Sequence, residues 1–366
     1  MTELVLLGAG HAHLQVLRAL AVQPLARAQV TLVSPQGSLL YSGMLPGLLA
    51  GHYDEADCTI AIEPLAARAG ARFIQAAAVG MDAAARRLCL DDGRELRYDV
   101  LSVDIGSVTE RDTIAGAREL ALPVRPPGPL SRRLQGLLAG EQERAPSLVV
   151  VGGGAVGFEI ALALQFRLGG RSRVSLVSGA ASVLEAYPAA VRRLGLRALQ
   201  RRGIALFDQT CRQVDEDSLT LGDGTRLRCD VAVLAIAGTA PRWLAASGLA
   251  LDERGFVATR ATLQSTSHAD VFAAGDVAAR ADAPRPRSGV FAVRAGAPLA
   301  SNLRRWVGGE ALQPYRPPSR SLNLLACGER RAIVAWGRFA AEGRWAWRWK
   351  DSIDRRFVAH FTGGTA

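Results

Sequence analysis

Two glycine-rich turns in this chain have the residue types that bind a pyrophosphate. The first contains Gly8 and Gly10, follows the apolar residues 4–7 directly and opens a helical stretch through about Leu20. Glycine permits a tight turn and lets backbone N–H groups approach a pyrophosphate, which then lies at the positive end of the following helix. This context predicts dinucleotide binding, although His13 stands where a third glycine is usual.

The second turn, residues 152–157, has all three glycines of the pattern, Gly152, Gly154 and Gly157. It also follows an apolar run and precedes a helical stretch, which is the context that makes this short motif specific. Glu159 lies in the first turn of that helix, where a carboxylate interacts favourably with the helix dipole. The sequence therefore predicts a second dinucleotide site.

Neither turn is followed by the usual reader of the ribose. An Asp or Glu about 20 residues after the glycines normally binds the 2′-hydroxyl, but this chain has Ser34 and Ser178 there. A serine can also hydrogen-bond a hydroxyl group, with less selectivity. No arginine follows Ser178 until Arg192, so the signature of a 2′-phosphate site is absent too. The sequence leaves NADH and NADPH open.

The elements around the two turns repeat at a constant spacing. Residues 4–10 (LVLLGAG) and 148–154 (LVVVGGG) are 144 apart, as are residues 30–34 and 174–178. Each unit is an apolar strand, a glycine turn, a helix and a second apolar strand, the pattern of a parallel sheet covered on both faces. The predicted fold class is α/β, with two Rossmann-like dinucleotide-binding domains in one chain.

Further apolar strands end at a glycine and suggest how the domains follow one another. They precede Gly106, Gly238 and Gly275, and Asp276 follows the last. A chain that begins one nucleotide domain, inserts a second and returns to the first has this order. We expect the first domain at residues 1–112 and 239–310, the inserted domain at 113–238, and a small C-terminal segment at 311–366.

The composition fits this interpretation. Of 366 residues, 49% are hydrophobic and 21% charged, which excludes a disordered, collagen-like or disulfide-scaffold chain. The five cysteines are scattered and never closely paired, so no metal site is expected. The sequence has no apolar run long enough to span a membrane and no cleavage signal after Met1, so we expect a cytoplasmic protein.

The last 56 residues differ from the rest in charge and aromatic content. They carry +6 of the net charge of +10 and four of the six tryptophans. Residues 344–349 alternate with the period of a strand, and Ile353, Phe357 and Phe361 form the apolar stripe of a helix. Such a segment packs on the body, lies on an anionic membrane surface or binds a protein partner. No nucleic-acid-binding motif occurs, so nucleic acid is not expected as a partner.

Four elements in this order resemble the pyridine nucleotide-disulfide oxidoreductase superfamily of two-dinucleotide-binding flavoproteins. They are the turn at Gly8, the strand that ends in Gly106, the turn 152–157 with Glu159, and residues 272–276 (FAAGD). The C-x-x-x-x-C of that family is replaced by residues 41–47 (YSGMLPG), which excludes the dithiol reductases. This loop resembles that of type II NADH dehydrogenases and sulfide:quinone reductases.

A narrower resemblance is to the flavoprotein often fused in front of selenide, water dikinase. It rests on residues 10–13 (GHAH), 41–47 (YSGMLPG), 104–107 (DIGS), 289–294 (GVFAVR) and 349–357 (WKDSIDRRF). This chain would be the stand-alone form. If the C-terminal segment binds a protein partner, the candidates are a separate dikinase and a second copy of the chain in a homodimer. If it lies on a membrane, we expect the inner face.

The resemblance implies that the first domain binds FAD and the inserted domain binds NAD(P)H. Asp276, after Gly275, would contact the ribityl and pyrophosphate region, and Glu159 would be the candidate catalytic residue on the nicotinamide side. A helix from Gly289 would direct the amides of Val290 and Phe291 at the flavin edge where reduction leaves negative charge. The other expected cofactor contacts are Gly8, Gly10, His11, His13, Ser34, Tyr41, Pro46, Gly106, Gly152, Gly154, Gly157 and Ser178.

Together these features predict an FAD-dependent NAD(P)H dehydrogenase that passes electrons to a small-molecule acceptor other than a protein disulfide. The first candidate acceptor is a quinone, and the second is a selenium or sulfur species. Cys327 lies roughly where sulfide:quinone reductases have a reactive cysteine, but we favour an inert buried side chain. A flavin-binding partner or sensor module with little turnover is the alternative of a different class.

Overall fold

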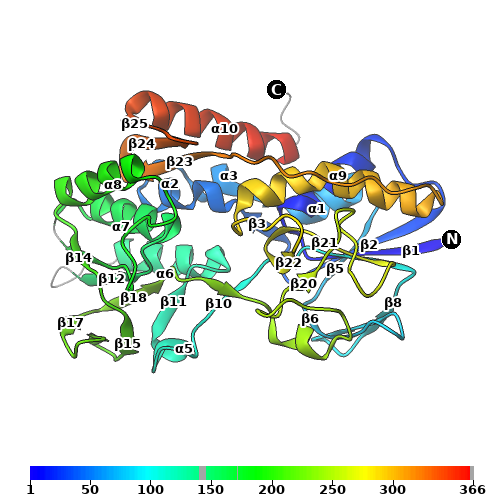
Figure 1. Cartoon of the computed structure of the whole chain (residues 1–366), viewed down its shortest axis with the longest axis horizontal. Helices are drawn as coiled ribbons and strands as arrows, with labels where there is room; N and C mark the ends of the chain where they lie inside the picture. Colours follow the sequence, from blue (N-terminus) through cyan, green and yellow to red (C-terminus); the bar gives the residue numbers. More distant parts are fainter. Residues whose placement is uncertain (140–145, 171, 363–366) are drawn as a thin grey trace.

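The computed structural model describes residues 1–139, 146–170 and 172–362. These residues form two lobes side by side, each with a parallel β-sheet, and a C-terminal segment that lies along one edge of both (Figure 1). The first lobe is at the right in Figure 1 and the second at the left.

The first lobe is built on a parallel sheet with the order β21-β9-β1-β2-β5. Its strands are β1 (Thr2–Leu7), β2 (Ala28–Ser34), β5 (Arg72–Gln75), β9 (Val100–Val103) and β21 (Val271–Ala273). Helix α1 (His11–Val22) connects β1 to β2 and packs against α9 (Gly289–Val307). Helices cover one face of the central strands, and short strands and loops that include Met81, Leu88 and Phe256 cover the other. Burial from both faces explains the continuous apolar sequences of these strands.

The second lobe repeats this plan with the strand order β11-β18-β12-β13-β14. Its strands are β11 (Ala121–Pro123), β12 (Ser147–Val151), β13 (Arg173–Val177), β14 (Ala205–Phe207) and β18 (Val231–Leu234), with helices α7 (Ala155–Arg167) and α8 (Ala189–Arg201) between them. Leu4 pairs with Val30 and Leu148 pairs with Val174. The repeat of 144 residues thus reflects two equivalent βαβ units in the same register.

Two adjacent segments carry the chain between the lobes. Strand β10 (Val108–Thr109) pairs antiparallel with β19 (Gly238–Thr239), so the chain leaves and re-enters the first lobe side by side. Strand β21 then completes the first sheet. The expected domain boundaries near residues 112, 238 and 310 stay predictions.

The remaining elements are short or lie at the edges of the lobes. In the first lobe they are β3 (Ser38–Leu40), α2 (Leu45–Leu49), α3 (Glu55–Cys58), β4 (Thr59–Ala61), α4 (Ile62–Arg68), β6 (Ala78–Asp82), β7 (Arg87–Leu90), β8 (Glu95–Arg97), β20 (Val257–Ala258), β22 (Ala278–Ala279) and 3-10 helices at Ser42–Met44, Arg242–Ala246 and Gly275–Val277. In the second lobe they are α5 (Ala117–Leu120), α6 (Pro127–Ala139), β15 (Cys211–Val214), β16 (Ser218–Leu221) and β17 (Arg226–Arg228).

The C-terminal segment is an antiparallel sheet followed by one long helix. The strands β23 (Leu322–Cys327), β24 (Glu329–Trp336) and β25 (Phe339–Gly343) pair in sequence order, and α10 (Arg344–Thr362) packs on β24. The prediction of a strand over residues 344–349 is therefore wrong. Ala346 is fully buried whereas Trp345 and Trp349 are exposed, so the Arg-Trp alternation places its residues on different faces of a helix.

The predicted apolar stripe of this helix is also only partly correct. Phe361 is buried in the main hydrophobic core, but Ile353 is 40% exposed. The inward face has instead the pair Lys350 and Asp354, which form a buried ion pair between Ala346 and Val358. The inward face of α10 therefore repeats every four residues, at positions 346, 350, 354 and 358. These positions are shifted by one from the predicted stripe through Ile353 and Phe357.

Candidate functional site

The buried side chain of His13 hydrogen-bonds to the first glycine turn. Its Nδ1 lies 2.6 Å from the carbonyl oxygen of Gly8, and its Nε2 lies 2.8 Å from Ser102 Oγ. The ring is fully buried, and burial lowers its pKa to about 4, so the imidazole is neutral. His13 therefore braces the turn at the position of the missing third glycine, and both its ring nitrogens already have protein partners.

Asp104, at the end of β9, caps the helix that follows the turn. Its Oδ2 accepts hydrogen bonds from the amides of Ala12 (2.8 Å) and His13 (2.9 Å). Burial raises the pKa of this carboxyl to about 7. The close approach of Asp104 explains both glycines of the turn, because a Cβ on Gly8 or Gly10 would overlap Asp104 atoms.

This turn still fits a dinucleotide such as FAD. Gly8 has a φ of +91°, in the left-handed region that favours glycine in a tight turn. Asp104 occupies the amides of Ala12 and His13 but not that of His11, the first helical residue. The His11 Nε2 is a buried polar atom with no hydrogen-bond partner among the described residues, and such an atom needs one.

An aromatic group lies beside this turn. The Tyr41 ring stacks on Phe357 at 4.4 Å between centroids, and His11 contacts both rings at 5.5 Å and 5.9 Å. Burial lowers the pKa of His11 to about 4, so this ring is neutral as well. The structure thus brings the predicted His11 and Tyr41 together and adds Phe357 from α10, which was expected only as a core residue.

Lys350 joins α10 to the loop after β3. Its Nζ donates to the carbonyl oxygen of Gly43 at 2.6 Å and to Asp354 Oδ2 at 2.7 Å. Asp354 also accepts a hydrogen bond from the Tyr41 hydroxyl, and its pKa is raised by burial against the opposing effect of Lys350. This buried network holds the loop of residues 41–47 in place.

Glu159 reaches the same region from α7 in the second lobe. The prediction that it lies in the first turn of this helix is wrong, because α7 begins at Ala155 and Glu159 is its fifth residue. Its Oε1 accepts a hydrogen bond from the Ala326 amide at 2.7 Å. Burial raises the pKa of Glu159 to about 7, while the nearby Lys350 ammonium lowers it. Glu159, Lys350, Asp354 and Tyr41, hereafter the buried ionisable cluster, thus gather side chains from three distant parts of the chain.

The second glycine turn is tighter and has no capping carboxylate. Gly152 has a φ of +129°, and a Cβ on Gly157 would overlap the Gly152 carbonyl oxygen. Helix α7 begins at Ala155 with Gly154 as its N-cap, and no side chain caps it. Its first amides therefore stay available to an anion.

In the second lobe a carboxylate lies beside the ribose position, and the sequence did not predict it. Ser178, at the end of β13, donates a hydrogen bond from its Oγ to Asp208 Oδ1 at 2.7 Å. Asp208 follows β14, the neighbouring strand. In the first lobe the equivalent Ser34 donates to the Gln36 carbonyl oxygen at 3.1 Å, without a carboxylate partner among the described residues.

The last part of the predicted FAD site lies where β21 ends. Gly275 has a φ of +72°, and a Cβ there would overlap Asp104. Asp276 follows it. Burial raises the pKa of Asp276 above its usual value, against the opposing effect of the Arg125 and Arg287 guanidinium groups.

Helix α9 begins at Gly289 as predicted, but the Phe291 amide donates to the Ser288 carbonyl oxygen at 3.1 Å. Its first turn therefore offers the Val290 amide rather than that of Phe291.

The other predicted contacts have less specific surroundings. Gly106 has a φ of +70°, in the left-handed region that favours glycine. Pro46 is buried in the first turn of α2. All five cysteines are free, and Cys327 is buried with a raised pKa, which agrees with an inert side chain. The described residues include no group of three or more His, Cys, Asp or Glu side chains that could hold a metal ion.

Residues 2–296 of the chain match the pyridine nucleotide-disulphide oxidoreductase family. Oxidoreductase ptaL of Pestalotiopsis fici is 27% identical over 363 residues, which cover 94% of each chain. A type II NADH:quinone oxidoreductase of Staphylococcus epidermidis is 25% identical over 390 residues, which cover 99% of this chain and 96% of that protein.

Solved structures share the fold over the full length of the chain. The sulfide:quinone oxidoreductase of Aquifex aeolicus superposes with a TM-score of 0.81 at 18% identity, covering 100% of this chain and 92% of that one. NDH2 from Plasmodium falciparum, solved in complex with NADH, has a TM-score of 0.78 at 12% identity and covers 100% and 99%. Both structures support the predicted two-lobed α/β fold.

Proposed function

Since the chain belongs to the pyridine nucleotide-disulphide oxidoreductase family, we propose that it is an FAD-dependent NADH dehydrogenase that passes electrons to a quinone. A type II NADH:quinone oxidoreductase that aligns with 99% of the chain supports this activity. The observation that carries the proposal is the buried ionisable cluster, which lies against the loop after β3 where a dithiol reductase would need its cysteines.

The chemistry requires one proton that NADH does not supply. Bound FAD accepts a hydride and returns two electrons to the second substrate. Reduction of a quinone to a quinol consumes two electrons and two protons, whereas a hydride carries two electrons and one proton. Glu159 can hold the additional proton, because a group with a pKa of about 7 is about half protonated near neutral pH.

The remaining members of the cluster position the reactants. Lys350 holds the Gly43 carbonyl and Asp354, and Asp354 in turn orients the Tyr41 ring beside His11. The Lys350 ammonium also limits the rise in the pKa of Glu159. We therefore assign Glu159 to proton transfer and Lys350 to positioning and electrostatic control.

The variant Glu159→Gln tests this assignment, with Glu185→Gln at an exposed position as the matched control. We expect Glu159→Gln to leave reduction of the flavin by NADH within about threefold of wild type and to slow quinone reduction by at least about tenfold, the range of general acid catalysis. Equal quinone rates in both variants would contradict the proton-transfer role.

For the nicotinamide cofactor we propose a preference for NADH over NADPH. The Asp208 carboxylate beside Ser178 can accept a hydrogen bond from a ribose hydroxyl, and it would repel a 2′-phosphate. Asp208 thus supplies, from the next strand, the acidic group that the sequence lacks at position 178.

For the place of action we propose the surface of an anionic membrane, where a lipid-soluble quinone is found. No helix among the described residues is long and apolar enough to cross a bilayer. Helix α10 instead exposes Trp345, Trp349 and Ile353 at intervals of four residues, beside exposed arginines. We expect Trp345→Ala/Trp349→Ala protein to lose most of its binding to anionic vesicles in a sedimentation assay and to keep its flavin. Unchanged binding would contradict this placement.

Some of the earlier expectations stay hypotheses. They are an acceptor that contains selenium or sulfur, contact with a separate selenide, water dikinase, and a homodimer. The residues 349–357 that suggested the dikinase include Lys350 and Asp354, whose part in the buried ionisable cluster already accounts for them.

A further inference from the structure

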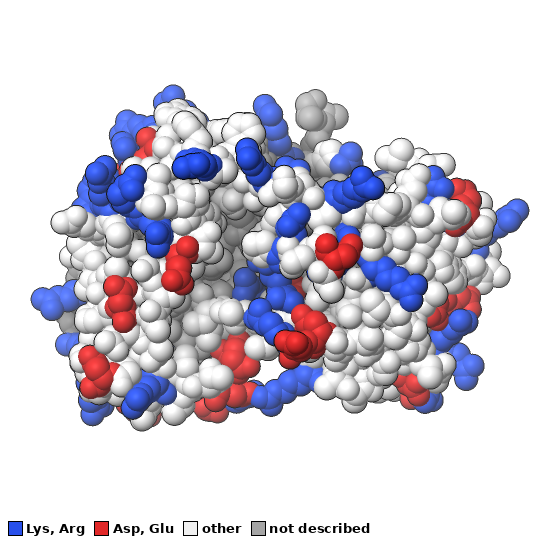
Figure 2. Space-filling model, viewed as in Figure 1, with Lys and Arg blue, Asp and Glu red and all other residues white. Residues whose placement is uncertain are grey.

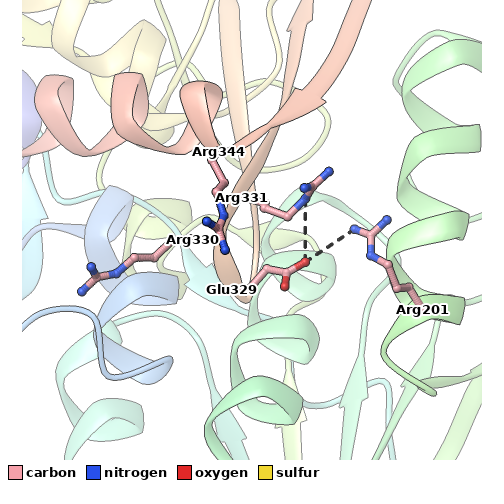
Figure 3. A pocket seen from close by; sticks show the side chains of 5 residues that line it. All are labelled: Arg201, Glu329, Arg330, Arg331 and Arg344. Carbon is pink, nitrogen blue, oxygen red and sulfur yellow. Dashed lines mark ion pairs between the residues drawn. The ribbon is translucent and has the colours of Figure 1, made fainter.

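A pocket of about 360 Å³ lies outside the buried ionisable cluster, where the end of α8, the start of β24 and the start of α10 meet (Figure 3). It is lined by Arg201, Glu329, Arg330, Arg331 and Arg344. Figure 2 shows blue side chains gathered over this part of the molecule, at the upper left where α8 and β24 lie in Figure 1. Four of the five lining side chains are therefore cationic, and they come from three separate elements.

Two carboxylates neutralise only part of this charge. Glu342 pairs with Arg201 at 2.5 Å and with Arg331 at 3.1 Å. Glu329 pairs with Arg202 and lies 3.8 Å from both Arg201 and Arg331. Three arginines thus share two carboxylates.

Arg330 and Arg344 add charge that has no counterpart. Neither forms an ion pair with a carboxylate in the described parts of the chain, and Arg330 instead lies over the Trp347 ring at 5.3 Å. Figure 3 shows Arg330 pointing away from Glu329. The four other arginines, Arg201, Arg202, Arg331 and Arg344, accompany the two carboxylates, which leaves a surplus of two positive charges. Like charges held this close repel one another unless an anion lies between them.

Further donors point to the same ligand type. Arg344 is the first residue of α10, so the positive end of that helix adds to the field of the arginines. Arg202 does not line the pocket but pairs with Glu329, which does, and so offsets part of that carboxylate's charge. Guanidinium groups and helix amides together are the donors that recognise phosphate oxygens.

We propose that this pocket binds a phosphate group, either free in solution or as the phosphomonoester head of a lipid. A phosphate dianion carries two charges and several acceptor oxygens, which matches a surplus of two positive charges better than a single carboxylate does. The site lies apart from both glycine turns, so it does not depend on the proposed electron transfer.

The first test is a titration of the FAD-loaded protein with inorganic phosphate at constant ionic strength, with chloride as the reference, followed by tryptophan fluorescence. Arg344→Ala is the pocket variant, and Arg348→Ala is the matched control because Arg348 is exposed on the same helix and does not line the pocket. We expect saturable phosphate binding that weakens at least about tenfold in Arg344→Ala and less than twofold in Arg348→Ala. A response equal to that of chloride, or equal weakening in both variants, would overturn the proposal.

A gain of affinity gives a readout that misfolding cannot produce. Glu329→Gln removes a repelling carboxylate from the pocket, so phosphate should bind this variant more tightly than wild type. Weaker binding by a folded Glu329→Gln protein would contradict the site.

Vesicles distinguish the two sources of the phosphate group. The protein is sedimented with phosphatidylcholine vesicles that contain either phosphatidic acid or phosphatidylserine at equal surface charge. A preference for phosphatidic acid that Arg344→Ala abolishes identifies the lipid head, whereas binding of inorganic phosphate without that preference identifies a soluble ligand. Each variant should be reduced by NADH at the wild-type rate, so failure here is separable from failure of the proposed function.

Discussion

The two glycine turns share the same backbone arrangement, but their backbone N–H groups have different hydrogen-bond partners. Gly8 packs against the carbonyl of Asp104, and Gly152 packs against the carbonyl of Ala235 at the equivalent place. In the first turn, Asp104 adds a carboxylate that caps the helix, and His13 braces the turn from below. In the second turn the equivalent of Asp104 is Ala235, which has no polar side chain.

This difference indicates two kinds of binding. The first turn satisfies most of its amides within the protein, so it is preformed for a cofactor that stays bound. The second turn leaves the first amides of α7 free, and no protein atom lies near the side-chain position of Gly154, so a ligand can approach there. Such an open end suits NADH, which must enter and leave in every cycle.

The largest expected effect follows from the closest contact in the second turn. In Gly157→Val the side chain would overlap the Gly152 carbonyl oxygen and push α7 away from the turn. We expect kcat/KM for NADH to fall by more than about a hundredfold, since misplacement of this size has such costs, while the flavin content stays near wild type. Gly80→Ala, where a Cβ makes only ordinary contacts, is the control. Loss of flavin together with NADH reduction would show that the two turns are not independent.

The next largest effect concerns His13, which stabilises the first turn. His13→Ala leaves the Gly8 carbonyl and the Ser102 hydroxyl buried without a partner, and we expect it to lower the free energy of unfolding by about 3 kcal/mol. Urea denaturation measures this loss. His360→Ala removes an exposed imidazole and should change stability by less than about 0.5 kcal/mol. Equal stability of the two variants would mean that His13 does not brace the turn.

Asp104 gives the first turn a pH dependence that the second lacks. Because burial raises its pKa to about 7, the folded protein binds this proton more tightly than the unfolded chain does. The free energy of unfolding therefore falls as the pH rises from about 4 to about 7. One pKa unit corresponds to about 1.4 kcal/mol, so Asp104→Asn should reduce the loss of stability between pH 5 and pH 8 by about 2 kcal/mol.

Glu159 has a pKa raised in the same direction and contributes equally to wild type and to Asp104→Asn, so it cancels in this comparison. Urea denaturation at the two pH values supplies the measurement. An identical loss of stability in both proteins would show that Asp104 does not ionise within this range.

The smallest effect concerns the ribose positions. Asp208→Ala should lower the preference for NADH over NADPH by about tenfold, because it removes one charged hydrogen-bond acceptor and the repulsion of a 2′-phosphate. Ser34→Ala in the first lobe, which lacks such a carboxylate, should change FAD affinity by less than about threefold. Steady-state kinetics with both nucleotides tests the first expectation. An unchanged nucleotide preference would refute the role of Asp208.

The sequence predicted well those features that depend on neighbouring residues, such as turns and strands. The repeat of 144 residues predicted both parallel sheets, since glycine turns and apolar strands are read from neighbouring residues. Asp208 could not be found in this way, because only the strand order brings β14 beside Ser178. The prediction of a strand over residues 344–349 fails because the alternation of Arg and Trp also fits an amphipathic helix next to a sheet.

The composition of the chain contains a signal for Lys350. It is the only lysine among 44 basic residues, so a compact ammonium rather than a guanidinium is present at this one position. In the structure the Lys350 Nζ lies between the Gly43 carbonyl oxygen and Asp354, two acceptors that a compact ammonium reaches together.

The most direct test of the account is an anaerobic stopped-flow experiment at about 450 nm on the FAD-loaded protein. NADH is mixed first, and a soluble quinone is mixed second. We predict that NADH bleaches the flavin within seconds, faster than NADPH does, and that the quinone restores the yellow colour. A flavin that neither nucleotide bleaches, or a reduced flavin that the quinone leaves colourless, would contradict the assignment as an NADH:quinone dehydrogenase.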